Sequence, residues 1–127
     1  MKNYSIKPFI KKVKKPWGWE AIFTEPKSPH TGKIIFVRRG ARLSLQYHDQ
    51  KEETICLLWG KAEIWLEDNQ GKIRRLPMEV EKGYRIKRKQ KHRLVALEES
   101  CFLEVSQPEK GTTYRLEDDY GRSNETK

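Results

Sequence analysis

The fold is decided by one stretch, Gly40-Ala-Arg-Leu-Ser-Leu-Gln46-Tyr-His48-Asp-Gln-Lys-Glu-Glu53-Thr-Ile-Cys-Leu-Leu-Trp-Gly60. Residues 42–48 alternate between polar and apolar side chains, which predicts a β-strand. Gln46 and His48 are two residues apart, so a strand places both on one face. After a short polar turn, Glu53 begins a second apolar run that can return toward them. The stretch therefore predicts two strands that bring an amide, an imidazole and a carboxylate together.

A second imidazole can join this group. His92 opens a later apolar run, and its neighbours on the same strand face are Leu94 and Ala96. One amide oxygen, one carboxylate and two imidazoles can hold a divalent transition metal and leave positions open for water or substrate. The alternative interpretation of each histidine is an ordinary polar residue on a strand, and glutamine is an uncommon metal ligand.

The rest of the chain also predicts strands and turns, without an internal repeat. No segment keeps the helical period of about 3.6 residues for three turns, so no helix is expected. Short β-branched or alternating runs recur at a spacing of about 8–12 residues, which is typical of a sandwich or barrel. The expected strands cover residues 32–38, 42–48, 53–59, 61–67, 72–76, 84–88, 92–97 and 101–106.

Length and composition exclude several classes of protein. A chain of 127 residues suits one domain, and four tryptophans, five tyrosines and four phenylalanines argue against a disordered polyampholyte. The longest apolar run, Ile55–Trp59, is far shorter than the roughly 20 residues of a membrane span. Residues 1–15 lack the apolar centre of a secretory signal, and two cysteines cannot make a disulfide framework. We expect a cytoplasmic protein.

The net charge of +9 is unevenly distributed. Residues 1–15 and 82–93 are basic runs without any acid, and each is either a solvated surface or a contact for phosphate or nucleic acid. No recognised nucleic-acid-binding motif accompanies them, so a nucleic-acid partner is not expected. We interpret residues 1–127 as a single domain with a basic arm at 1–13 and a frayed tail at 123–127.

The motifs resemble those of a known family. Gly-x5-Gln-x-His-x4-Glu-x6-Gly resembles the first cupin motif, with Gln46 in place of the usual histidine. Residues 42–48 resemble the cupin domain of type II mannose-6-phosphate isomerases, which often forms the C-terminal half of bifunctional mannose-1-phosphate guanylyltransferases. Lys15-Pro-Trp-Gly-Trp-Glu20 and Arg115-Leu-Glu-Asp-Asp-Tyr-Gly-Arg122 resemble its opening and closing segments. The resemblance implies an all-β fold, a small single-domain cupin with a double-stranded β-helix or jelly-roll barrel.

The resemblance also implies a reaction, the aldose–ketose isomerisation of a sugar phosphate. Gln46, His48, Glu53 and His92 would hold one divalent ion. Zinc is the first expectation, and manganese, iron or nickel suits the same mixed nitrogen and oxygen ligands. The basic chain and this reaction both predict an anionic small molecule, a sugar phosphate, as the partner.

The phosphate of such a substrate needs cations at the mouth of the site. Arg122 is the best candidate from the resemblance, with Lys15 and Arg38 behind it, and a surface or strand-edge charge is the alternative for each. Arg42 shares a strand face with Gln46 and His48, so it either lines the cavity or pairs with Glu104.

The catalytic base is not identified by the sequence. Strand faces leave three candidates open, namely Glu63, Glu104 and Lys61.

One motif departs from the family pattern. The stretch Lys87-Arg-Lys-Gln-Lys-His92 stands where the family usually has Pro-x-Gly-x-x-His. Proline and glycine would set a tight turn that aims the histidine inward, so their loss predicts a changed loop and rim. This keeps a second function open, a metal-binding cupin that acts on another anionic carbohydrate or only binds it.

A homodimer is expected from the faces of the strands. If Gln46 points into the barrel, the pleat sends Leu43, Leu45 and Tyr47 outward, and both faces of Ile34–Val37 are apolar. A second copy would cover this surface. The alternative is that the chain's own segment Tyr4–Trp19 folds back over it and leaves a monomer.

Overall fold

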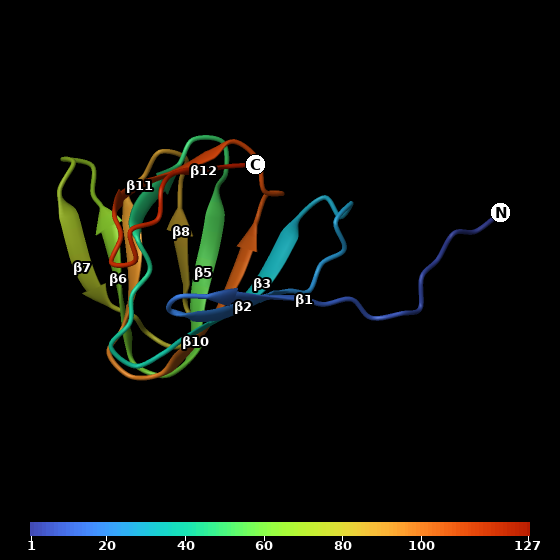
Figure 1. Ribbon diagram of the computed structural model, residues 1–127, viewed down its shortest axis with the longest axis horizontal. Helices are drawn as coiled ribbons and strands as arrows, with labels where there is room; N and C mark the ends of the chain where they lie inside the picture. The colour runs from blue at the N-terminus through green and yellow to red at the C-terminus, as the bar shows by residue number, and fades with distance from the viewer.

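The computed structural model describes all 127 residues, and it consists of twelve strands without a helix. Figure 1 shows the strands packed as two layers. The strands are β1 (Lys11–Lys15), β2 (Gly18–Ile22), β3 (Thr31–Val37), β4 (Leu45–His48), β5 (Glu53–Trp59), β6 (Ala62–Glu67), β7 (Ile73–Pro77), β8 (Gly83–Ile86), β9 (His92–Ala96), β10 (Ser100–Ser106), β11 (Thr112–Glu117) and β12 (Glu125–Thr126). The predicted all-β class is confirmed.

Each layer is a six-stranded sheet. The strand orders are β1-β2-β3-β10-β5-β8 and β12-β11-β4-β9-β6-β7, and every pairing between named strands is antiparallel. Pairing between strands distant in sequence places Glu104 opposite Lys33 on one side and Ile55 on the other. In the second sheet, Gln46 lies opposite His92. The sheets thus bring the predicted site residues together from separate parts of the chain.

The interior of the barrel has an apolar half and a charged half. Along β3 the inward positions are Lys33, Ile35 and Val37, and along β5 they begin with Glu53 and continue with apolar residues. The apolar half is a twelve-residue cluster whose centre includes Phe102, which is fully buried. A strand that alternates between in and out can therefore carry one charged group into the barrel while its other inward residues build the core.

The ends of the chain differ from the sequence-based expectation. The extended residues before Lys11 project away from the barrel in Figure 1, so they do not fold back over the sheets, and the expected basic arm ends where β1 begins. The tail expected to be frayed at 123–127 contains β12, which pairs with β11. These strands were missed because their sequences lack an alternating apolar pattern.

The expected outward patch on residues 43–47 is wrong in part. After a single bridge at Arg42 the chain leaves the sheet, and β4 begins only at Leu45, so the alternation does not continue through both segments. Leu43 packs against the core and Leu45 is buried, with 8% of its surface exposed. Tyr47 stacks on Tyr114 with ring centroids 4.9 Å apart.

The structure contains no helix that is long and apolar enough to cross a membrane. Both cysteines, Cys56 and Cys101, are free thiols.

Candidate metal centre

Three side chains converge at the boundary between the two halves of the barrel. His48 comes from the end of β4, Glu53 from the start of β5 and His92 from the start of β9. One potential ligand atom from each lies within 4.8 Å of the other two, and all three residues are buried. The strands, which are fixed by their ladders, thus position the predicted imidazole and carboxylate groups around one point.

The two histidines approach Glu53 through their Nε2 atoms. His48 Nε2 lies 3.4 Å and His92 Nε2 lies 3.1 Å from the same oxygen, Oε1 of Glu53. Their other ring nitrogens are held elsewhere: His92 Nδ1 donates to the Gln90 carbonyl at 2.9 Å, and His48 Nδ1 lies 2.9 Å from the Thr113 hydroxyl. Neither buried Nε2 atom has a hydrogen-bond partner.

This geometry fits a divalent cation. A carbonyl only accepts hydrogen bonds, so His92 carries its proton on Nδ1 and, when neutral, turns the lone pair of Nε2 toward the Glu53 carboxylate. Two lone pairs that face each other repel unless a cation lies between them. Two imidazole nitrogens and one carboxylate oxygen are donors that suit Zn²⁺ and other first-row transition metal ions.

The protonation states also suit metal binding. Burial alone would raise the pKa of Glu53, but Lys51 and the two imidazoles outweigh it and hold this pKa well below its usual range. Burial lowers the pKa of His48 and outweighs the attraction of Glu53. At neutral pH the site therefore presents a carboxylate and a neutral His48 imidazole, which are the forms that bind metals.

Gln46, the fourth predicted ligand, lines the same cavity. Its Oε1 accepts a hydrogen bond of 2.6 Å from the Ser44 hydroxyl, which orients the amide oxygen while one of its lone pairs stays free.

The altered loop before His92 keeps the histidine aimed inward. Lys89 adopts a left-handed backbone conformation (φ 66°), which takes the place of a turn glycine at a cost in strain. Its N–H donates to the His48 carbonyl at 2.7 Å, and the Gln90 side chain ties the loop to Glu67. The altered sequence therefore keeps a tight turn, closed by the Gln90 N–H donating to the Lys87 carbonyl at 3.2 Å, and the basic residues Lys87, Arg88 and Lys89 lie outside the cavity.

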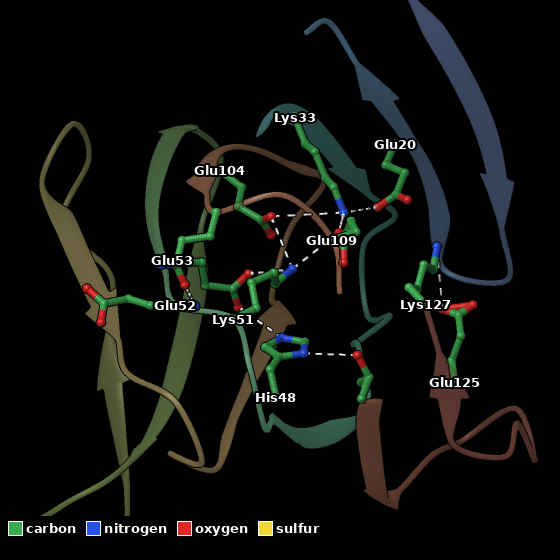
Figure 2. Close-up of polar contacts among 12 residues, drawn as sticks. Glu20, Lys33, His48, Lys51, Glu52, Glu53, Glu104, Glu109, Glu125 and Lys127 are labelled. Carbon is green, nitrogen blue, oxygen red and sulfur yellow. Dashed lines mark hydrogen bonds and ion pairs between the residues drawn. The ribbon is translucent and has the colours of Figure 1, made fainter. Parts of the chain in front are cut away.

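A group of buried ions adjoins His48, as Figure 2 shows. The Lys51 ammonium lies 3.3 Å from Glu53 Oε2, 3.6 Å from Glu104 Oε2 and 3.2 Å from Glu109 Oε1. Lys33, also buried, bonds to Glu109 and lies 4.0 Å from Glu104. Burial lowers the pKa of each lysine, but the surrounding carboxylates raise both above the usual value, so both ammonium groups stay charged.

One of the three candidate bases lies at the site. Glu104 lines the cavity, and burial together with the nearby Glu53 raises the pKa of Glu104 to about 7. Glu63 instead accepts a hydrogen bond from the Trp65 indole, and Lys61 is exposed outside the cavity.

Two of the four predicted rim cations lie where the sequence places them. Arg122 and Lys15 line the cavity, with Arg122 held in a bidentate contact by Asp118. Arg115 lies at the same mouth and was missed, although it stands in the closing motif. Its buried Nε atom has no hydrogen-bond partner.

The structure places the other two predicted rim cations outside the cavity. Arg38 is exposed and donates to the Pro16 carbonyl outside the cavity. Arg42 neither lines the cavity nor pairs with Glu104. Because the chain leaves the sheet after Arg42, this side chain points outward and makes a bidentate contact with Asp119 at 2.7 and 2.9 Å.

Besides Arg115, the charged cavity residues Lys33, Lys51 and Glu109 also escaped the sequence-based prediction. Lys33 could have been predicted from the strand period, since it shares a strand face with the apolar Ile35 and Val37. Lys51 lies between two predicted ligands but carries no periodic pattern. Glu109 comes from an irregular loop, where the sequence gives no information on side-chain direction. The cavity, which opens at a mouth, measures about 80 Å³.

Comparison with solved structures identifies the fold as a cupin barrel. Bacillus subtilis oxalate decarboxylase superposes with a TM-score of 0.75 at 17% identity over 91% of this chain and 33% of its own length. A structure of that enzyme from a study of its Mn(II) centres gives a TM-score of 0.69 at 14% identity, covering 85% and 31%. The capsular polysaccharide assembling protein CapF from Staphylococcus aureus gives 0.64 at 13% identity, covering 91% and 31%. The chain spans about a third of each of these proteins.

The family is shown by sequence. Residues 2–125 match the family model described as mannose-6-phosphate isomerase C-terminal, and the chain belongs to that family. No curated protein matches the chain.

The buried ions predict a pH dependence of stability. Burial would raise the pKa of Glu109, but Lys51 and Lys33 lower it from 4.5 to about 2. A carboxylate whose pKa is depressed in the folded state stabilises above its unfolded pKa and loses this effect as the pH falls toward the folded value. Glu109→Gln should therefore destabilise by on the order of 2 kcal/mol at pH 7, and the difference from wild type should shrink between about pH 4.5 and 2.

Urea unfolding of metal-free protein across this pH range measures the difference. Glu79→Gln, which removes a carboxylate paired with the exposed Lys82, is the matched control. A Glu109→Gln effect that is independent of pH would contradict the role assigned to the lysines.

Proposed function

We propose that this protein is a metal-dependent sugar-phosphate isomerase that interconverts an aldose and a ketose, with mannose 6-phosphate as the first substrate to test. One observation carries the proposal: two unpartnered imidazole nitrogens and a carboxylate oxygen converge at the wall of a cavity that has Arg122, Arg115 and Lys15 at its mouth, with His48 and Glu53 lining that cavity and His92 lining a hollow next to it. The family membership supports the sugar phosphate as the substrate class.

Each part of the cavity has a role in this proposal. His48, Glu53, His92 and the Gln46 amide oxygen hold the ion, which is zinc in the first instance. A divalent ion at this point supplies Lewis acidity toward the carbonyl and hydroxyl oxygens of the sugar. Isomerisation also moves a proton between two neighbouring carbons, and Glu104 is the candidate base within the cavity.

The mouth provides selectivity for an anion. Arg122, held by Asp118, and Arg115, with its free Nε atom, present fixed guanidinium groups, which recognise phosphate through charge-assisted hydrogen bonds.

We also place the protein in the cytoplasm, because free cysteines are typical of a reducing compartment.

The metal site is tested by composition. Purified wild-type protein should contain one divalent ion per chain, and His48→Ala/His92→Ala should lose it, because two of the ligands are removed. Elemental analysis measures both. His30→Ala, at an exposed loop histidine, is the control and should keep the ion. Full occupancy in the double variant would show that the ligand assignment is wrong.

The activity is tested with metal-loaded protein, mannose 6-phosphate and fructose 6-phosphate. Loss of one charge-assisted bidentate contact costs about 1.5–3 kcal/mol, so Arg122→Ala should weaken sugar-phosphate binding roughly 10- to 150-fold and leave neutral mannose almost unaffected. Arg38→Ala, outside the cavity, is the control. An equal loss for both sugars would make Arg122 structural, and absence of interconversion would reject the isomerase.

A second function is favoured by the size of the cavity. Its volume of about 80 Å³ is small for a ligand pocket, so a hexose phosphate would extend into the mouth. A smaller anionic carbohydrate would fit the cavity alone. In this second function the protein either converts such a carbohydrate or only binds it. Binding of mannose 6-phosphate without turnover by metal-loaded protein would favour this second function.

We also propose a homodimer, formed through the outer face of the first sheet. Trp19 and Phe36 stack there across the β2–β3 pair, and Leu103 lies next to them on β10. Trp59 and Val105 continue the face with 48% and 52% of their surfaces exposed. The chain's own N-terminal segment leaves this face open, and contiguous exposed apolar surfaces of this kind mark interfaces.

The dimer is tested by sedimentation at micromolar concentration. Wild type should sediment as a dimer, and Val105→Asp should shift it to the 15.1 kDa monomer, because a charge would be buried without a partner. Leu116→Asp, at a similarly exposed position on the other sheet, is the control. A monomeric wild type would contradict the proposal.

A further inference from the structure

Two lysine ammonium groups inside the barrel share a single oxygen atom. Lys33 and Lys51 expose 7% and 4% of their surfaces, and both bond to Oε1 of Glu109, the latter at 3.2 Å. Figure 2 shows the three side chains pointing toward one another. A carboxylate oxygen between two buried cations marks a position with a strong preference for an oxyanion.

The carboxylate that fills this position stands on a loop, whereas the neighbouring carboxylates stand on strands. Glu53 and Glu104 stand on β5 and β10, in the middle of the first sheet, and are almost fully buried. Glu109 stands on the irregular loop 107–111 between β10 and β11, and its side chain is 25% exposed. The two strand residues are fixed by ladder hydrogen bonds, whereas Glu109 can leave the cavity by a movement of its loop.

We propose that Lys33 and Lys51 form an anion-binding subsite, that Glu109 occupies it in the absence of ligand, and that an oxyanion group of the substrate displaces Glu109. The oxyanion is a carboxylate or a phosphate. The inference deepens the proposed function and rests on it for the identity of the rest of the ligand, a carbohydrate bound at the adjoining metal centre.

Charge supports an exchange of one anion for another. The cavity holds two ammonium groups and the carboxylates of Glu53, Glu104 and Glu109, and Glu20 approaches Lys33 at 4.0 Å. A divalent cation at the histidines would balance these carboxylates. Removing Glu109 would then leave an excess positive charge, which an incoming oxyanion neutralises, so the exchange leaves no buried charge without a partner.

The position of the subsite indicates which part of the ligand it would bind. Lys51 contacts Oε2 of Glu53 while both imidazoles face Oε1 of the same carboxylate, so the subsite lies beside the metal centre. An oxyanion held there is close to the oxygens that the ion would bind. The subsite is separate from the mouth, where Arg122 and Arg115 lie, so a ligand that fills both carries two anionic groups and a sugar monophosphate fills only one of them.

The test uses full-length protein loaded with Zn²⁺, because the charge balance includes a divalent cation, and it measures anion binding, so that its result does not depend on isomerase activity. The amide NMR signals of residues 107–111 are followed while inorganic phosphate and, separately, acetate are added at constant ionic strength. Glu109→Ala should bind at least one of these anions about tenfold more tightly than wild type, because the internal competitor is gone. The anion with the larger gain identifies phosphate or carboxylate as the group recognised.

Two further variants make the result specific. Glu109→Ala/Lys33→Met removes one charge of each sign and should lose the gain in anion affinity. Glu79→Ala removes an exposed carboxylate, so it changes the net charge of the protein by the same amount as Glu109→Ala, and it should bind anions like wild type. Equal affinities of Glu109→Ala and Glu79→Ala would overturn the subsite, as would a gain that survives Lys33→Met. If the double variant does not fold, the comparison of the two single variants decides alone.

Discussion

The structure depends on one buried carboxylate, that of Glu53. Its Oε1 faces two imidazoles and its Oε2 faces the Lys51 ammonium, while 3% of the residue is exposed. A carboxylate this deep is tolerated only when its charge is balanced and its oxygens have partners, because desolvation of an unpaired ion costs several kcal/mol. The two lysines, the carboxylates of Glu104 and Glu109 and the two imidazoles are arranged around this requirement.

The barrel meets the requirement by dividing its interior. Central strands place charged residues at one end of their inward face and apolar residues at the other, so the fully buried Val37, Leu57, Ile64 and Phe102 pack away from the ions. The apolar half supplies the free energy that holds the charged half in place. A site built on such strands is rigid, since each functional side chain is fixed by its neighbours in the ladder.

The parts of the fold that could be predicted are those with a strand period. The alternation around Gln46 and His48, the apolar runs at Glu53 and His92, and the motifs that they form indicated the barrel and the convergence of three potential ligands. The alternation was less reliable where a strand is interrupted. Between Arg42 and Leu45 the chain leaves the sheet, so Arg42 points outward and Leu43 points inward. No local sequence pattern indicates this interruption. β1, β11 and β12 were missed because neighbouring strands, rather than their own composition, hold them.

Three of the residues whose roles escaped prediction share a location. Lys51, Glu109 and Lys89 stand on connections between strands, where side-chain direction depends on individual backbone hydrogen bonds and not on a period. Lys89 shows how such a connection can change in sequence and keep its shape, since one left-handed residue and its bond to the His48 carbonyl replace a proline–glycine turn. The strands thus determine where the three potential ligands converge, and the connections determine which charged groups lie around them. For this reason the sequence of such a barrel predicts the chemistry of its site better than it predicts the specificity of that site.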